Sequence, residues 1–256
     1  MRRKFLLGVG LLAFAAAGGG SAIAADIGAR PIAPPPPQPP PAFISDWAGF
    51  YIGINGGGGS ASTSFEPQRF ANINGVASSS FIPPSGSPSG GIFGFQAGHN
   101  WQWGPIVGGL EFDFDGADLT DSTTFFHFGA PDAFTRDIKV DELASARARF
   151  GYLIFPNWLL YGTTGLGFGH FRIDATDTLA GNFASTSNFV NEFGWVVGAG
   201  LEWKFFDHWL LRGEWLHYDF GKETINGADV APGGVLSNFN FRNTVDVGRA
   251  ALSYKF

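Results

Sequence analysis

The sequence predicts an all-β protein, an eight-stranded antiparallel up-and-down transmembrane β-barrel with long external loops and short periplasmic turns. Three observations predict this fold. Apolar and polar side chains alternate along eight segments, the connections between segments are alternately short and long, and the last residue is aromatic. The composition agrees, because 38 Gly, 28 Phe and 8 Trp accompany only 15% charged residues, well below the roughly 25% of ordinary soluble domains.

The alternation is clearest between residues 192 and 205. There Phe193 and Trp195 share one parity with other apolar residues, while Glu202 and Lys204 share the opposite parity with glycines. The same reasoning places the strands at 50–59, 92–103, 106–116, 140–155, 158–174, 192–205 and 209–220, with a last strand that ends at Phe256. Only in 158–174 is the parity ambiguous.

The connections between these strands alternate sharply in length. Three are tight turns, at Gly104-Pro105, Pro156-Asn157 and residues 206–208. Four are long and polar, at about 61–91, 120–139, 176–191 and 222–241. Short turns at one end and long loops at the other are typical of outer-membrane barrels.

The two parities also predict which face meets lipid. The bulky parity is expected to face lipid, while glycine and charge face a narrow lumen packed with small and paired polar residues. Aromatic residues gather near the tight turns, which predicts a girdle at the membrane interface. Its members are Trp101, Trp103, Trp158, Trp203 and Trp209.

Charged residues within the strands mostly share the parity opposite the aromatic residues. A charge facing lipid at mid-bilayer would cost about 2–4 kcal/mol, and eight strands leave an interior just wide enough for side chains. We therefore hypothesise a lumen ion-pair network that closes the barrel, with a narrow gated pore as the alternative. Asp115 shares the same parity. The predicted members of the network are Glu111, Asp113, Arg147, Arg149, Glu202, Lys204, Arg212, Glu214 and Arg249.

Two segments precede the predicted barrel at 46–256. Residues 1–24 read as a signal peptide, because three basic residues and a short apolar run lead to a small-residue motif, with cleavage near Ala24/Ala25. Residues 25–45 form a proline-rich periplasmic segment, in which Pro31–Pro41 is either a solvated spacer or a ligand for another envelope component. The net charge of −6 argues against nucleic acid as a partner.

Catalytic and metal-binding sites are not predicted, and no cofactor is expected. The absence of cysteine excludes a disulfide framework, a thiolate zinc site and a cysteine nucleophile. The five histidines are scattered without metal-ligand spacing. His127, within the aromatic run 125–128, is a candidate axial ligand for haem, although packing on the barrel rim or resting in the outer leaflet is the alternative.

The carboxyl end alternates Leu252, Tyr254 and Phe256, the usual signal read by the barrel assembly machinery. Together with the segments WAGFYIG at 47–53, SARARFGY at 145–152 and GWVVGAGLEW at 194–203, and with NWLLYGT at 157–163, the chain resembles the porin-family outer-membrane immunogenic proteins of alphaproteobacteria. These are OmpA-like eight-stranded barrels. The resemblance implies an outer-membrane location, with membrane lipid, lipopolysaccharide and the assembly machinery as partners.

The function expected from these observations is that of a structural or surface-interaction protein rather than an enzyme. The resemblance also leaves open a small porin-like diffusion channel or a haem-binding surface protein. A barrel hydrolase would require loop or rim residues to converge on a catalytic site.

Overall fold

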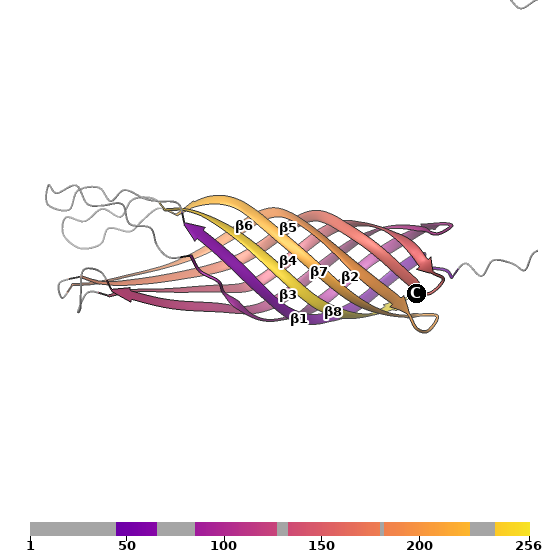
Figure 1. Ribbon diagram of the computed structural model, residues 1–256, viewed down its shortest axis with the longest axis horizontal. Helices are drawn as coiled ribbons and strands as arrows, with labels where there is room; N and C mark the ends of the chain where they lie inside the picture. Colours follow the sequence, from indigo (N-terminus) through magenta and orange to yellow (C-terminus); the bar gives the residue numbers. More distant parts are fainter. Residues whose placement is uncertain (1–44, 66–84, 127–132, 180–181, 226–238) are drawn as a thin grey trace, which may run out of the picture. The chain divides into compact units, whose positions relative to one another are not determined.

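Side-chain alternation along the chain gives eight long strands (Figure 1). A computed structural model describes residues 45–65, 85–126, 133–179, 182–225 and 239–256. The predicted signal peptide and residues 25–44 of the proline-rich segment lie outside the described residues. The strands are β1 Gly49–Phe65, β2 Ser89–Trp103, β3 Ile106–Phe126, β4 Ala133–Phe155, β5 Trp158–Leu179, β6 Asn182–Lys204, β7 Trp209–Ile225 and β8 Phe239–Lys255.

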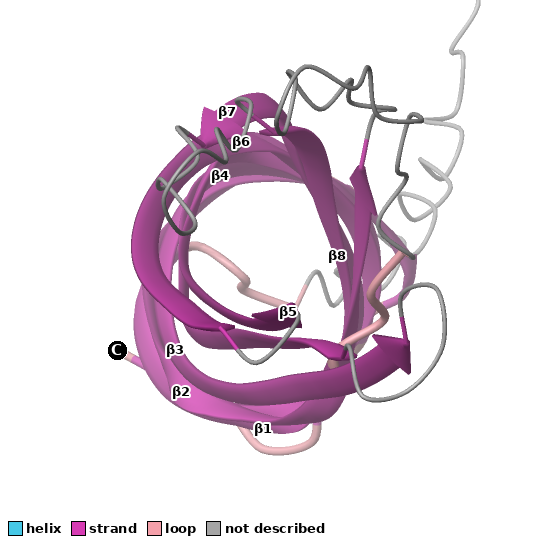
Figure 2. Ribbon diagram, turned by 90° about the vertical axis from the view of Figure 1, so that its left-hand side faces the viewer, coloured by secondary structure: helices cyan, strands magenta, loops and turns pink. Residues whose placement is uncertain are grey.

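The strands close into a ring, which Figure 2 shows along the barrel axis. Each strand pairs antiparallel with the next, and β1 pairs with β8 to complete the barrel, for example at Ile54↔Leu252. Among the described residues, no helix is long and apolar enough to cross a membrane. The predicted all-β, eight-stranded, up-and-down barrel is confirmed.

The three predicted tight turns are present at one end of the barrel. Residues 104–105, 156–157 and 205–208 connect β2 to β3, β4 to β5 and β6 to β7. Gly104 has a φ of +60°, a conformation that glycine adopts without the Cβ clash of other residues. The sequence therefore locates these turns within one or two residues.

Two of the four predicted long loops are mostly strand, which corrects the sequence interpretation. Ladder pairing continues through 120–126 and 133–139, as in Thr123↔Arg136, and through 176–179 and 182–191, as in Thr176↔Ser185. These stretches are mostly polar with scattered apolar residues, so they lack the regular alternation from which strands are predicted. Their Thr, Phe, Ile and Val residues nevertheless favour extended backbone.

These continuations form a protruding sheet, defined as residues 121–126 of β3, 133–143 of β4, 170–179 of β5 and 182–194 of β6. The pairing of β2 with β3 ends at Thr120, and the pairing of β6 with β7 begins only at Trp195. In Figure 1 these strands reach past the rest of the barrel on the left. The sheet thus extends the end opposite the tight turns.

The alternating faces of the strands separate into an outward apolar belt and an inward face. Exposed Phe, Leu, Ile and Trp side chains cover the outside of the strands. The structure resolves the ambiguous parity of β5, where Leu160 and Leu166 face outward and Leu159, Tyr161 and Phe171 are buried inward. Large apolar side chains therefore also occupy the lumen, which corrects the expectation of small and polar residues alone.

Candidate functional site: the closed lumen

The centre of the lumen holds a cluster of arginines and carboxylates contributed by five strands. Antiparallel register sets charges of opposite sign on neighbouring strands, as in Glu111↔Arg147 and Glu214↔Arg249. The central cluster, as we name it here, consists of Glu111, Asp113, Asp115, Arg147, Arg149, Glu202, Arg212, Glu214 and Arg249, all buried.

Arg147 joins carboxylates from two separate strands. Its Nη2 donates to Glu111 Oε1 at 2.6 Å and to Asp113 Oδ2 at 2.9 Å, while its Nη1 donates to Glu214 Oε1 at 3.0 Å. Arg249 continues the chain of contacts, with Nη2 2.9 Å from Glu214 Oε2 and Nη1 3.3 Å from Asp113 Oδ1. The guanidiniums thus span the lumen between β3 and β7–β8.

A second set of contacts completes the cross-section. Arg212 Nη1 donates to Glu111 Oε2 at 2.6 Å, and both Arg212 and Arg149 pair with Glu202. Tyr51 donates to Glu111 at 2.6 Å, and Tyr161 donates to Glu214 at 2.8 Å. Because buried charges are tolerated when they are paired and hydrogen-bonded, this arrangement can hold the lumen shut.

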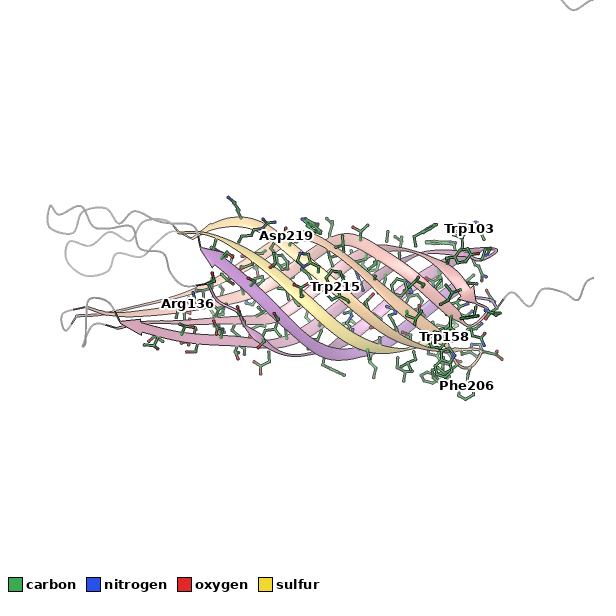
Figure 3. All side chains as sticks on the ribbon, viewed as in Figure 1. Trp103, Arg136, Trp158, Phe206, Trp215 and Asp219 are labelled. Atoms are coloured by element: carbon green, nitrogen blue, oxygen red, sulfur yellow. The ribbon has the colours of Figure 1, made fainter. Side chains whose placement is uncertain are left out.

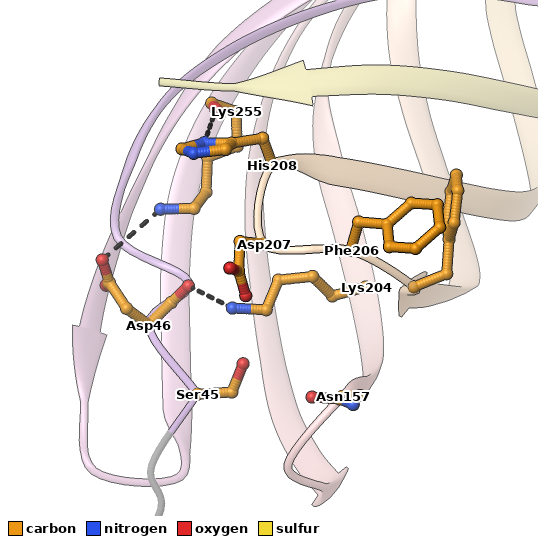
Figure 4. A pocket seen from close by; sticks show the side chains of 9 residues that line it. Ser45, Asp46, Asn157, Lys204, Phe206, Asp207, His208 and Lys255 are labelled. Atoms are coloured by element: carbon orange, nitrogen blue, oxygen red, sulfur yellow. Dashed lines mark hydrogen bonds and ion pairs between the residues drawn. The ribbon is translucent and has the colours of Figure 1, made fainter.

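Lys204 is the one predicted member that the structure does not bring into the central cluster. It lies at the tight-turn mouth of the barrel, where its Nζ donates to the backbone oxygen of Asp46 at 2.9 Å (Figure 4). Parity placed Lys204 on the correct face but carried no information about its depth in the lumen. Lys255 accompanies it, donating to the Ala48 oxygen at 2.8 Å and pairing with Asp46 at 3.4 Å. These side chains line a mouth pocket of about 400 Å³.

Trp47 closes that mouth from within, and sequence reasoning missed this role. The side chain is fully buried, its Nε1 donates to the Pro156 oxygen at 3.1 Å, and its backbone N–H donates to Gln102 Oε1 at 2.7 Å. It packs with an apolar cluster that includes Leu159 and Leu210. The available signal was a lone tryptophan directly before the first strand, where no alternation yet marks a face.

A second apolar layer lies in the lumen on the other side of the central cluster. Described members include Leu119 on β3, Phe171 on β5, Leu216 on β7 and Val245 on β8. Phe171 and Phe220 meet edge to face with ring centroids 5.3 Å apart. Along the barrel axis the described lumen therefore holds an apolar plug, an ion-pair layer and another apolar layer.

Comparison with known proteins gives this barrel a family. The family model described as "Outer membrane protein beta-barrel domain" matches residues 12–248. The chain belongs to this family. It is also 33% identical over 218 residues to the 31 kDa outer-membrane immunogenic protein of Brucella melitensis, covering 82% of this chain and 84% of that relative. These findings locate this outer-membrane barrel protein in the cell outer membrane.

The chain is also similar to solved structures of low identity. The outer membrane protein OprG of Pseudomonas aeruginosa is 13% identical with a TM-score of 0.46, covering 82% of this chain and 96% of its own. The outer membrane protease OmpT of Escherichia coli is 10% identical with a TM-score of 0.49, covering 81% and 97%. At these identities the likeness concerns the fold alone.

The predicted aromatic girdle of the outer-membrane barrel lies at the tight-turn end. Trp101, Trp103, Trp203 and Trp209 are exposed on the outward face, and half-buried Trp158 stacks on Trp203 with centroids 5.6 Å apart. Figure 3 shows Trp103 and Trp158 at this end.

Two further outward tryptophans, Trp195 on β6 and Trp215 on β7, lie away from the tight turns and both contact the ring of His217. Figure 3 shows Trp215 midway along the barrel. At the carboxyl end, Leu252, Tyr254 and Phe256 all face outward.

The remaining predicted site residue, His127, lies outside the described residues. The described histidines do not converge: His170 bonds Asn191, His208 bonds the Lys255 oxygen, and His217 bonds Asp246. Among the described residues, no group of three or more His, Asp or Glu side chains could hold a metal ion.

Proposed function

We propose that this outer-membrane barrel is a non-conducting structural protein that also serves as a surface-interaction protein. The observation that carries the proposal is the closed lumen, in which the Arg147 side chain is fully buried among Glu111, Asp113 and Glu214. The Trp47 plug and the second apolar layer flank this cluster. An ion crossing the membrane would have to displace all three layers.

Planar-bilayer recording tests the closed lumen. We expect the purified wild-type barrel to give only leak-level current, because the central cluster fills the cross-section. Steady openings in the wild type, with a conductance that changes in Arg147→Gln, would contradict the proposal and favour a pore. Heat-modifiable gel mobility of the inserted protein provides the folding control.

The protruding sheet is the surface that we assign to external contacts. Polar side chains link its strands, as in Arg136–Asp121 at 3.5 Å and Thr124–Thr135 at 3.0 Å. Within the described residues, the pairing of β6 with β7 begins at Trp195, and residues 182–191 of β6 have no paired strand on that side. An open strand edge is a common place for an extended segment of another protein to add.

Cysteine labelling tests which side of the membrane the protruding sheet occupies. The chain has no native cysteine, so single substitutions give a clean background. On intact Gram-negative cells, a membrane-impermeant maleimide should label Ser187→Cys on the sheet and leave Asp207→Cys in a tight turn unlabelled, since both side chains are exposed. Permeabilised cells should label both variants. The reverse pattern on intact cells would invert the topology.

A further inference from the structure

The membrane-facing wall carries a groove over β1, β2 and β3 with a volume of about 530 Å³. Cross-strand register explains its shape, because Ala97 lies between Ile52 on β1 and Phe112 on β3. Ile52 and Phe112 are exposed and project from the wall, whereas Ala97 presents only a methyl group. The result is a groove along β2 whose sides are formed by large apolar side chains and whose floor is formed by Ala97.

Both ends of the groove are defined by aromatic side chains. On the side of the protruding sheet, Phe95 and Phe114 lie with ring centroids 5.9 Å apart, in the row next to Ala97. On the tight-turn side the lining includes Trp101, a member of the aromatic girdle. The groove therefore runs from the interior of the apolar belt to the periplasmic interface.

His99 is a polar side chain in this otherwise apolar lining. Its ring is held edge-on to Phe50 at 4.3 Å and against Trp101 at 4.5 Å. The Nδ1 atom is covered and has no hydrogen-bond partner, so a hydrogen bond to a group outside the protein would be made at Nε2. A polar side chain facing lipid is costly unless it finds a partner.

We propose that this groove binds one phospholipid of the periplasmic leaflet. An acyl chain lies over Ala97 between Ile52 and Phe112, and an ester or phosphate oxygen accepts a hydrogen bond from His99. The choice of leaflet follows from Trp101, because the aromatic girdle at the tight turns marks the periplasmic headgroup level. Lipopolysaccharide would occupy the opposite leaflet.

Native mass spectrometry of the purified full chain tests this site, with palmitoyl-oleoyl-phosphatidylethanolamine added after detergent delipidation. We expect the wild type to retain one phospholipid per barrel. Ala97→Phe should abolish retention by filling the floor. His99→Phe keeps an aromatic ring and should reduce retention about tenfold, the change expected for losing a hydrogen bond to a charged group.

The matched control is Ala250→Phe, which fills an exposed small-residue position on β8 outside the groove. It should retain the phospholipid like the wild type, and heat-modifiable mobility should show every variant folded. Equal retention by wild type and Ala97→Phe would overturn the proposal. The proposal would also be overturned if Ala250→Phe lost the phospholipid as fully as Ala97→Phe, since lipid retention would then not depend on the groove. A lipopolysaccharide adduct displacing the phospholipid would contradict the assigned leaflet.

Discussion

Arg147→Ala should lower the free energy of unfolding of the barrel by about 3–5 kcal/mol, the range for breaking a buried ion pair from one side. The arginine contacts Glu111, Asp113 and Glu214, all within 3.0 Å of its guanidinium nitrogens. Removing it leaves three buried carboxylates with one fewer cation among them. The remaining arginines already serve other carboxylates, so little compensation is available.

Urea unfolding of the barrel in lipid vesicles, followed by tryptophan fluorescence, measures this loss. Lys139→Ala is the matched control, because its ammonium is 40% exposed and pairs with the exposed Asp118 and the half-buried Asp141 outside the central cluster. Its removal should change stability little, as exposed ion pairs contribute weakly. Equal losses in the two variants would show that the central cluster adds nothing beyond an ordinary surface pair.

A compensating substitution tests whether the loss comes from unpaired carboxylates. Adding Glu111→Gln to Arg147→Ala removes one of the carboxylates that the first change leaves in excess. The double variant should therefore lose less stability than the two single variants lose together, since the effects of residues in one network are not additive. Strict additivity would mean that the two side chains do not interact.

The central cluster was largely predictable because parity and strand order are both readable in the sequence. Glu111 and Arg147 lie on adjacent strands and share the inward parity, and the structure pairs them directly. Lys204 has the same parity but a different depth, which only the register reveals. Parity assigns a face of the strand, whereas depth depends on how far each strand is displaced along the axis.

Other features were hidden because they break the pattern used to find them. Residues 121–126, 133–139, 176–179 and 182–191 of the protruding sheet are mostly polar and do not alternate regularly, so their sequence resembles that of a loop. On β5, Leu159 and Phe171 fill the lumen while Leu160 faces out, so both parities are apolar and neither stands out. An alternation argument works only where lipid and a polar interior lie on opposite sides of the same strand.

Trp47→Ala should lower the free energy of unfolding by about 3–5 kcal/mol, the usual cost of truncating a buried large aromatic side chain. The indole fills the tight-turn mouth beside Leu159 and Leu210 and bonds the Pro156 oxygen. Trp47→Phe keeps an apolar ring but loses this hydrogen bond, so it should lose less. Trp103→Ala is the matched control, because its indole is 61% exposed on the outward face.

The same urea experiment ranks the three variants. Trp47→Ala should be the least stable, and Trp47→Phe and Trp103→Ala should each lose less, since the Trp103 indole lies at the membrane interface and not in a packed interior. If Trp103→Ala loses as much stability as Trp47→Ala, the indole at 47 contributes only ordinary surface packing. The segment at 46–48 also joins the strands around the mouth. The Trp47 N–H bonds Gln102 on β2, Lys204 on β6 bonds Asp46, and Lys255 on β8 bonds Ala48. Because these backbone contacts survive truncation of the indole and the central cluster lies deeper in the lumen, Trp47→Ala should weaken the barrel without making it conduct.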